Sequence, residues 1–223
     1  MTDLLVLRPE PGASRTMARA ALLGLAARAC PLFRIEPLDW SPPPASEFDA
    51  LLVTSAQAVR MGGAALARYH NLPAYGVGAA TAAALREAGF AKAIAGEADG
   101  AAIARRIAED GHRAVLHLAG ADVAPFDAGP LALSRVALYA AVEAADRPEL
   151  AAALAPGAVL LVHSRRAAAR LATLVDPADR GALHLIAISP AAMAASGAGW
   201  ASLQAAAAPN DDAMLALAAM LCK

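Results

Sequence analysis

Several hydroxyl side chains stand where they can bind a ligand, because each follows an apolar or glycine-rich run. They are Thr54, Ser55, Ser164 and Ser189 after apolar runs, and Thr81 after the segment GVGAA. The carboxyl ends of parallel strands share one edge of a sheet, and ligands of open α/β sheets bind at that edge. Helix N-termini there offer unpaired N–H groups and the positive end of a dipole. These hydroxyls therefore favour binding of an anion that bears many carboxylates, without a large lysine count.

The alternative for each hydroxyl is an ordinary helix N-cap, a role for which serine and threonine are preferred. Capping requires no ligand, so both interpretations stay open for each residue. The recurrence of such hydroxyls in both halves of the chain counts in favour of a ligand.

Three other side chains can act at the same edge. Arg8 directly follows the first apolar run, so its fork-shaped guanidinium can bind a carboxylate, although a solvated arginine fits the position equally well. The same two interpretations apply to Arg165. Tyr139 lies in a predicted connection between domains, where its phenol can face a cleft or simply pack.

Other chemical signatures are weak. The segment Gly76–Thr81 resembles a dinucleotide-binding loop but lacks the third glycine, so no nucleotide cofactor is expected. The five histidines show no metal-ligand spacing, and the two cysteines, Cys30 and Cys222, match no metal or redox motif. No G-x-S-x-G elbow is present. We expect neither a metal nor a cofactor.

An internal repeat supplies the elements that position these residues. ALLVTSA at 50–56 and AVLLVHSR at 158–165 are each followed by an Ala-rich helical stretch and a second apolar run. The offset is 109 for Ser55 and Ser164 and 111 for Asp99 and Asn210, two polar residues that precede helical stretches. The copies occupy roughly 48–110 and 150 to the end. Strands that alternate with helices predict parallel sheets covered by helices.

The segment before the first copy reads as strand, helix and strand. The strand is Leu4–Leu7, Ser14 caps a helix that runs to Arg28, and a second strand lies around Leu32–Ile35. This unit is too short for a domain, so we assign it to the domain of the second copy. After the first copy, strands are expected at Ala114–Leu118 and Ser134–Ala140.

The predicted domains are therefore discontinuous. Domain one comprises residues 1–36 and 144–223, domain two comprises 40–138, and linkers lie at about 37–40 and 139–143. Two crossings of this kind would leave the domains free to move.

Composition excludes several classes of protein. The net charge is −1, with 19 basic and 20 acidic residues and no basic stripe, which argues against a nucleic-acid partner. The hydrophobic fraction of 58% arises from alanine, and no stretch resembles a membrane-spanning helix or a signal peptide. We expect a cytoplasmic monomer without membrane contact.

Together these segments resemble the uroporphyrinogen-III synthase family. The resemblance covers nearly the whole chain, and the order and spacing of the segments carry it. They are Arg8-Pro9, Pro31-Leu32 to Pro37-Leu38, DALLVTSAQAV at 49–59, YGVGAATAAALREAG at 75–89, ALYAAVEA at 137–144, and the segments LLVHSRRAA and IAISPAA.

The resemblance implies a fold, a reaction and a site. The fold is two flavodoxin-like α/β domains, each a parallel sheet flanked by helices, joined by a two-stranded linker with the active-site cleft between them. The enzyme is a hydro-lyase without metal or cofactor that cyclises hydroxymethylbilane to uroporphyrinogen III, with inversion of ring D, in heme biosynthesis. The lability of this substrate is consistent with transient contact with the upstream deaminase.

For the site, the resemblance implies that Tyr139 protonates the leaving hydroxyl, since a phenol with a pKa of about 10 is protonated at neutral pH. The residues expected to bind substrate are Arg8, Thr54, Ser55, Gly78, Thr81, Gly120, Ser164, Arg165 and Ser189.

Two departures from the family pattern keep an alternative open. Ala191 and Ala192 stand where the family has hydroxyl residues after a proline, and the segment after Gly120 lacks the arginine that is frequent there. The alternative is a weakened or inactive paralogue that binds tetrapyrroles or regulates. An unrelated anion-binding receptor is disfavoured because no export signal is found.

Overall fold

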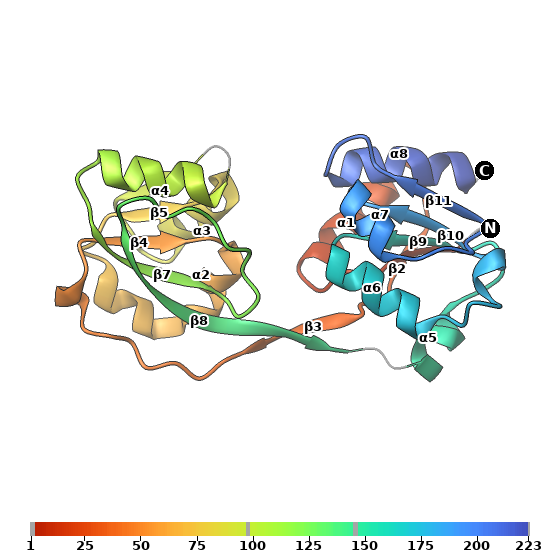
Figure 1. Cartoon of the computed structure of the whole chain (residues 1–223), viewed down its shortest axis with the longest axis horizontal. Helices are drawn as coiled ribbons and strands as arrows, with labels where there is room; N and C mark the ends of the chain where they lie inside the picture. The colour runs from red at the N-terminus through yellow and green to blue at the C-terminus, as the bar shows by residue number, and fades with distance from the viewer. Residues whose placement is uncertain (1–2, 97–98, 145–146, 223) are drawn as a thin grey trace. The chain divides into compact units, whose positions relative to one another are not determined.

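A computed structural model describes residues 3–96, 99–144 and 147–222. Contacts between Cα atoms divide the chain into two units: unit 1 contains residues 1–35 and 142–223, and unit 2 contains residues 36–141. Both are α/β units with a parallel sheet, as expected (Figure 1). The predicted domain limits at 36 and 144 lie close to this division, and residues 145–146 lie outside the described residues.

Unit 1 has a five-stranded parallel sheet in the order β11-β10-β9-β1-β2. Its strands are β1 (Leu4–Val6), β2 (Ala27–Ala29), β9 (Val159–Val162), β10 (His184–Ala187) and β11 (Ser202–Ala205). In chain order this is 2-1-3-4-5, the flavodoxin-like arrangement, whose switch point lies between β1 and β9. The central strands are buried on both faces, which is why they read as continuous apolar runs.

The helices of unit 1 cover both faces of its sheet. The helices are α1 (Gly12–Leu22), α5 (Arg147–Ala153), α6 (Arg165–Leu174), α7 (Pro190–Ala195) and α8 (Asp211–Leu221), with a short 3₁₀ helix η3 (Arg180–Ala182). Helices α1 and α8 share one apolar cluster with the sheet, built around Leu4, Val159 and Met214. Helices α6 and α7 pack against each other (Figure 1).

Unit 2 repeats the design with its chain order permuted. Its six-stranded sheet has the order β3-β8-β7-β4-β5-β6. The strands are β3 (Phe33–Pro37), β4 (Ala50–Val53), β5 (Ala74–Gly76), β6 (Ala93–Ala95), β7 (Ala114–Gly120) and β8 (Ala132–Glu143). Strands β4, β5 and β6 correspond to β9, β10 and β11, while β7 and β8 take the places that β1 and β2 hold in unit 1.

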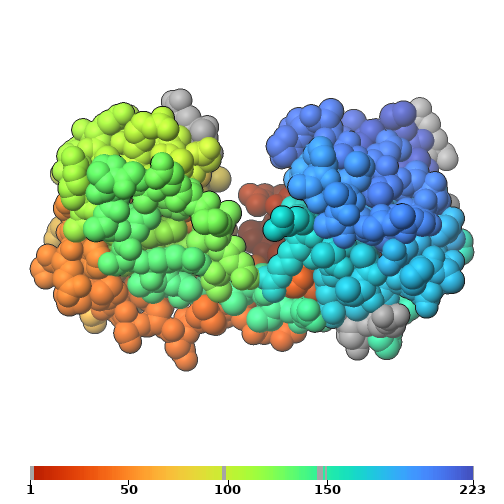
Figure 2. All heavy atoms as spheres, viewed as in Figure 1, coloured from red at the N-terminus to blue at the C-terminus, as the bar shows by residue number. Residues whose placement is uncertain are grey.

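The helices of unit 2 are α2 (Ala56–Gly62), α3 (Ala79–Glu87) and α4 (Gly100–Glu109), with 3₁₀ helices η1 (Ala45–Glu47) and η2 (Gly63–Tyr69). Helix α4 packs on one face of the sheet through Ile103 and Ile107. No helix joins β7 to β8 in the described chain. The connection, residues 121–131, is irregular and lies on the surface of the unit, in green in Figure 2.

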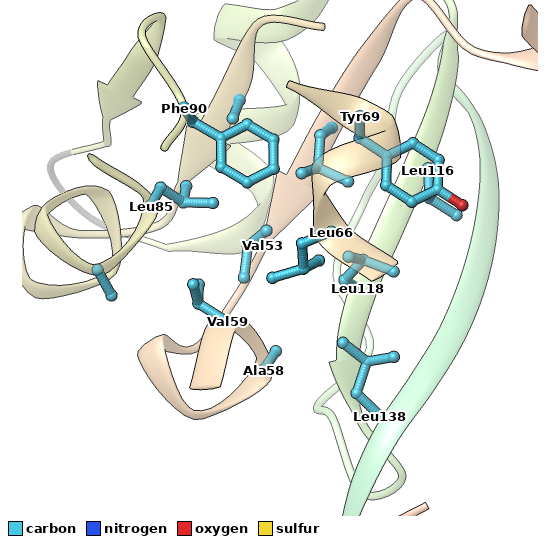
Figure 3. Close-up of a cluster of buried hydrophobic side chains, with 13 residues drawn as sticks. Val53, Ala58, Val59, Leu66, Tyr69, Leu85, Phe90, Leu116, Leu118 and Leu138 are labelled. Atoms are coloured by element: carbon cyan, nitrogen blue, oxygen red, sulfur yellow. The ribbon is translucent and has the colours of Figure 1, made fainter. Parts of the chain in front are cut away.

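The opposite face of this sheet packs on α2, η2 and α3 (Figure 3). Val53, Leu116, Leu118 and Leu138 project from the strands toward Val59, Leu66, Tyr69, Leu85 and Phe90, and all are buried. The Tyr69 hydroxyl donates a hydrogen bond to the Pro43 carbonyl over 2.8 Å, which satisfies its polar atom. This cluster packs β4, β7 and β8 against the helices on this face of the sheet.

The segment between β1 and β4 differs from the sequence-based expectation. The predicted helix to Arg28 ends at Leu22, and residues 27–29 form β2 instead. The predicted strand around Leu32–Ile35 is β3, which joins the other sheet beside β8. The sequence Ala-Arg-Ala of β2 lacks the apolar run that would predict a buried strand. The reason is that β2 is an edge strand with exposed side chains.

Ser14 is not the cap of α1, which begins two residues earlier, at Gly12. Instead, the carboxylate of Glu10 accepts hydrogen bonds from the backbone N–H and the hydroxyl of Ser14, over 3.1 and 2.8 Å. Ser14 therefore lies in the first turn of α1, and the carboxylate of Glu10 satisfies its backbone N–H group.

Candidate functional site

Tyr139 lies against Gly120 at the carboxyl end of β7. The pairing of β7 with β8 shifts between Ala119 and Gly120, so that Gly120 pairs with Tyr139. The N–H of Ala121 donates to the Tyr139 carbonyl over 2.8 Å. A Cβ atom on Gly120 would approach the Tyr139 ring to 2.8 Å, so only glycine allows this contact.

The register shift also explains the direction of the tyrosine side chain. Neighbouring residues of a regular strand point to opposite faces. Here Leu138 is fully buried in the cluster of Figure 3, and Tyr139 packs on the edge of the same cluster. A bulge re-aims side chains in this way, and bulges are frequent beside active sites.

A cavity of about 320 Å³ opens beside Tyr139. Its lining includes four of the predicted site residues, Thr54, Ser55, Gly120 and Tyr139. Residues 121–124 of the β7–β8 connection and Ala141 complete the wall. The carboxyl ends of β4 and β7 are thus brought together with the tyrosine of β8, all within unit 2.

A second cavity of about 310 Å³ adjoins the first. Thr54, Val123 and Ala124 line both cavities. The further wall consists of Val77, residues 99–101 at the start of α4, and Pro125-Phe126. The Thr54 side chain therefore stands where the two cavities meet.

Thr54 is hydrogen-bonded to His117, and its Oγ1 lies 3.3 Å from Nε2 of the imidazole. His117 is a strand residue of β7 and is 2% exposed. Burial, followed by the nearby positive charge of Arg135, lowers the pKa of His117 to about 4. The imidazole is consequently neutral at physiological pH.

Arg135 holds the end of β7 from the neighbouring strand. Its guanidinium donates to the Gly120 carbonyl over 3.0 Å and also to the Ala121 carbonyl. The segment after Gly120 contains no arginine, yet an arginine from β8 reaches its first residues. This side chain is bound to the backbone of the wall that faces the first cavity.

The predicted serines are N-caps of their helices. Ser55, Ser164 and Ser189 accept hydrogen bonds from N–H groups at the starts of α2, α6 and α7, over 3.1, 3.1 and 3.3 Å. Asp99 and Asn210 cap α4 and α8 in the same manner. All three serines are therefore N-caps. Because capping uses a hydroxyl oxygen as acceptor, each hydroxyl hydrogen remains able to donate.

The two predicted site residues around α3 differ in accessibility. Gly78 precedes the helix, and nothing lies within 4 Å of the place where its Cβ would be. Thr81 is 7% exposed and belongs to the buried side of α3. Gly78 therefore offers open backbone at the strand end, whereas Thr81 packs inside the unit.

In unit 1, Arg8 belongs to a cluster around Asp211, the first residue of α8. Asp211 accepts hydrogen bonds from Arg8 over 3.2 Å and from Thr16 of α1 over 3.0 Å, and its Oδ1 lies 3.1 Å from Nε2 of His163. The side chains of Asp211 and His163 are 11% and 5% exposed. The predicted anion-binding arginine is thus already paired with a carboxylate of the protein.

Burial lowers the pKa of both basic partners in this cluster. Burial lowers the pKa of Arg8, while Asp211 opposes that shift. Burial lowers the pKa of His163 to about 4, and the charge of Arg8 adds to this effect. The His163 imidazole of this cluster is therefore uncharged at neutral pH.

Arg165, the last predicted binding residue, is exposed at the start of α6. Sequence reasoning missed Asp211, His163 and His117. The sequence pattern drew attention to Asn210 rather than to the neighbouring Asp211, and the histidines were considered only as metal ligands. Their positions in the sequence could have indicated them. His163 directly follows β9, and Asp211 is the first residue of α8, so both lie at the ligand edge.

Among the described residues no cluster of histidine, cysteine and carboxylate side chains is suited to a metal ion. In the same part of the chain, no helix is long and apolar enough to span a bilayer.

Comparisons with known proteins agree with one another. The sequence model of the family described as uroporphyrinogen-III synthase HemD matches residues 14–216. No curated protein sequence gives a significant match. A uroporphyrinogen-III synthetase from Helicobacter pylori is similar in structure, with a TM-score of 0.71, 17% identity, and coverage of 99% of this chain and 100% of that one.

A mutant uroporphyrinogen III synthase from the extremely thermophilic bacterium Thermus thermophilus is also similar. Its TM-score is 0.54, with 17% identity and coverage of 100% of this chain and 99% of that one. At this level of identity the structural matches establish the fold.

Proposed function

We infer that this chain, which belongs to the uroporphyrinogen-III synthase family, catalyses the reaction of that family. Hydroxymethylbilane, a linear tetrapyrrole, is closed to uroporphyrinogen III with inversion of ring D and loss of water, a step of heme biosynthesis. We assign the chain to the hydro-lyases. The family match over residues 14–216 is the observation that carries this inference.

We propose that Tyr139 is the general acid for the first step. The phenol donates its proton to the terminal hydroxyl group while the C–O bond breaks, so that water leaves and a protonated azafulvene forms beside the phenolate. The substituted carbon of ring D attacks this group and gives a spiro intermediate. That intermediate breaks and recloses with ring D inverted, and the proton released when the pyrrole regains aromaticity restores the phenol.

The position of Tyr139 supports this role. Its ring rests on Gly120 at the wall of a cavity that also contains the hydroxyls of Thr54 and Ser55. Hydroxymethylbilane closes spontaneously to the uninverted isomer, so the protein must chiefly constrain geometry. A phenol fixed by a bulged strand and a glycine contact meets that requirement.

We propose that substrate carboxylates are bound by donors at the strand ends of the two units. In unit 2 these are Thr54, Ser55 and the open backbone at Gly78 and Gly120. In unit 1 they are Ser164, Ser189 and Arg165, with Arg8 shared between Asp211 and substrate. Thr81, which is buried, supports α3 and makes no direct contact in this proposal. The reaction requires no metal, cofactor, nucleic acid or membrane here, and the chain acts as a cytoplasmic monomer that receives substrate from the upstream deaminase.

The second candidate function, a weakened paralogue, is favoured by the absence of hydroxyls after Pro190. The accessibility of the two positions differs, because Ala191 is exposed and Ala192 is fully buried in α7. A hydroxyl side chain at position 192 would lie among buried residues, where no ligand could reach it. Only the alanine at 191 therefore represents a lost surface donor.

An isomer assay tests the proposal. Hydroxymethylbilane is generated in situ by the upstream deaminase, the chain is added, and the oxidised products are separated into isomers III and I. We expect predominantly isomer III from the wild-type chain, and formation about 100-fold slower from Tyr139→Phe, the lower end for general acid catalysis.

Tyr69→Phe is the matched control, since it removes a phenol of the same unit that donates only to the Pro43 carbonyl. It should retain the wild-type rate of isomer III formation. Isomer I alone, at the rate seen without protein, would exclude the synthase activity and favour a tetrapyrrole-binding role.

A further inference from the structure

The Thr54–His117 pair is the only described side-chain hydrogen bond that links a cavity-lining hydroxyl of unit 2 to a buried strand residue. Thr54 lines both cavities, while His117 lies behind it in β7 and is 2% exposed. A threonine hydroxyl can rotate, and the group behind it decides whether its hydrogen points inward or toward a ligand.

The surroundings hold the imidazole in place. Its ring meets the Phe126 ring edge-on, with centroids 5.6 Å apart. Phe126 in turn packs against Gly100, where a Cβ atom would approach the Phe126 ring to 2.6 Å. Strand β7 fixes the backbone of His117 between β4 and β8. The imidazole therefore acts as a fixed partner rather than as a mobile base.

Binding of an anionic ligand at Thr54 would require one direction of this hydrogen bond. If Thr54 donated to Nε2, only its oxygen lone pairs would face the cavities, and these repel carboxylates. If Nε2–H donates instead, the Thr54 hydroxyl hydrogen is free to bind an anionic group. The neighbouring cation Arg135 disfavours a protonated imidazole, so a neutral ring with one N–H is the form present.

We propose that His117 is a positioning residue that carries its proton on Nε2 and donates it to Thr54 Oγ1, so that the Thr54 hydroxyl donates to a carboxylate of the substrate where the two cavities meet. The part that concerns substrate rests on the proposed synthase function. The direction of the hydrogen bond is a property of the protein alone.

The first test measures that direction without substrate. The ¹⁵N chemical shifts of selectively labelled His117, assigned by its loss in His117→Leu, distinguish a protonated ring nitrogen from an unprotonated one. We expect Nε2 to be the protonated nitrogen at pH 7. A protonated Nδ1 with an unprotonated Nε2 would overturn the proposal whether or not the chain is a synthase.

The second test is a double-mutant cycle on isomer III formation. We expect His117→Leu and Thr54→Val each to lower kcat/KM about fivefold, mainly through KM, and the double variant to be no worse than Thr54→Val alone. Thr54→Ser should retain most activity because it keeps the hydroxyl. Independent, multiplying losses would show that His117 does not act through Thr54.

His70→Leu is the matched control for folding. His70 also meets a phenylalanine edge-on, Phe90, with centroids 4.8 Å apart, and hydrogen-bonds to the Ala88 carbonyl over 2.9 Å. It precedes β5 and so lies at the opposite edge of the sheet. We expect it to leave KM unchanged. A rise in KM equal to that of His117→Leu would reduce the effect to general destabilisation.

Discussion

The two units share one sheet architecture but use the ligand edge differently, as the first residue of their last helix shows. Asp211 begins α8 and Gly100 begins α4, and their offset of 111 is the one that relates the caps Asn210 and Asp99. In unit 1 the Asp211 carboxylate joins Arg8, His163 and Thr16. In unit 2, Gly100 lines a cavity and packs on Phe126.

The difference arises from the connection that follows β1 in unit 1 and the matching connection that follows β7 in unit 2. Helix α1 joins β1 to β2 and supplies Thr16 to the Asp211 cluster. No helix is described between β7 and β8, and residues 121–126 of the connection line the two cavities of unit 2 instead. The same fold thus pairs the charges at the ligand edge with each other in unit 1, and leaves cavities at that edge in unit 2. We expect unit 1 to depend on its charges and unit 2 on its shape.

The largest effect on this comparison is expected from Asp211→Ala. The change leaves the half-buried Arg8 and the Thr16 hydroxyl without their acceptor, so unit 1 should lose about 3 kcal/mol of unfolding free energy. Urea unfolding measures this loss. Trp200 belongs to unit 1 and Trp40 to unit 2, so a Trp40→Phe background makes fluorescence report on unit 1 alone.

Asp212→Ala is the matched control, because Asp212 is the next residue of α8, is 75% exposed and pairs with Arg19 at the surface. It should change stability by no more than about 0.5 kcal/mol. Equal losses for the two variants would mean that the cluster contributes nothing beyond the charge at the helix start.

The stability of both units should decrease in a similar way as pH falls, although their ligand edges differ. Each unit buries one neutral histidine, His163 or His117, with a pKa of about 4 against about 6.5 when unfolded. The unfolded chain binds the additional proton, so stability is fully present above about pH 6.5 and falls as pH decreases toward 4.

Between pH 7.5 and 5 each unit should lose about 2 kcal/mol. Urea unfolding at a series of pH values, followed by Trp200 or by Trp40, measures each unit. His163→Gln should flatten the curve of unit 1 and leave that of unit 2 unchanged. A stability of unit 1 that stays constant over this range in the wild-type chain would contradict a neutral, buried His163.

The smallest effect is expected from Gly100→Ala in unit 2. Alanine usually stabilises a helix relative to glycine by up to about 1 kcal/mol. Here its Cβ would lie 2.6 Å from the Phe126 ring, so we expect a loss of about 1 kcal/mol instead, measured through Trp40 in a Trp200→Phe background.

Two further variants test the steric explanation for Gly100. Phe126→Ala combined with Gly100→Ala should remove the additional cost. Gly181→Ala, where the nearest atom to the new Cβ is 3.9 Å away, should be close to neutral. A stabilised Gly100→Ala variant would show that Phe126 moves freely and that shape matters little at this edge.

Local signals in the sequence predicted much of the architecture. The repeat offsets predicted the matching strands β4 and β9, and Ser55, Ser164, Ser189, Asp99 and Asn210 are the caps expected from their residue types. Such features depend on near neighbours in the chain, so a sequence pattern is sufficient to identify them. The family resemblance was confirmed by the match over residues 14–216.

The errors fall where distant contacts decide the structure. The predicted helix to Arg28 was too long, because β2 is formed by pairing with β1 and has no apolar pattern of its own. The strand predicted at Leu32–Ile35 was assigned to the wrong sheet, since pairing beside β8 places it in the other one. One error was local instead: α1 begins at Gly12, so Ser14 lies inside the helix and its N–H donates to Glu10.

The sequence by itself determined the fold class, the repeat, the starts of α2, α4, α6, α7 and α8, and the residues gathered at the ligand edges. These features follow from periodicity and local hydrogen bonding. Only the tertiary structure decided which of those residues are accessible. It paired Arg8 with Asp211, buried Thr81, and set Tyr139 on Gly120 through a shifted register. These outcomes depend on contacts between residues far apart in the chain, whose energies leave no periodic trace in the sequence.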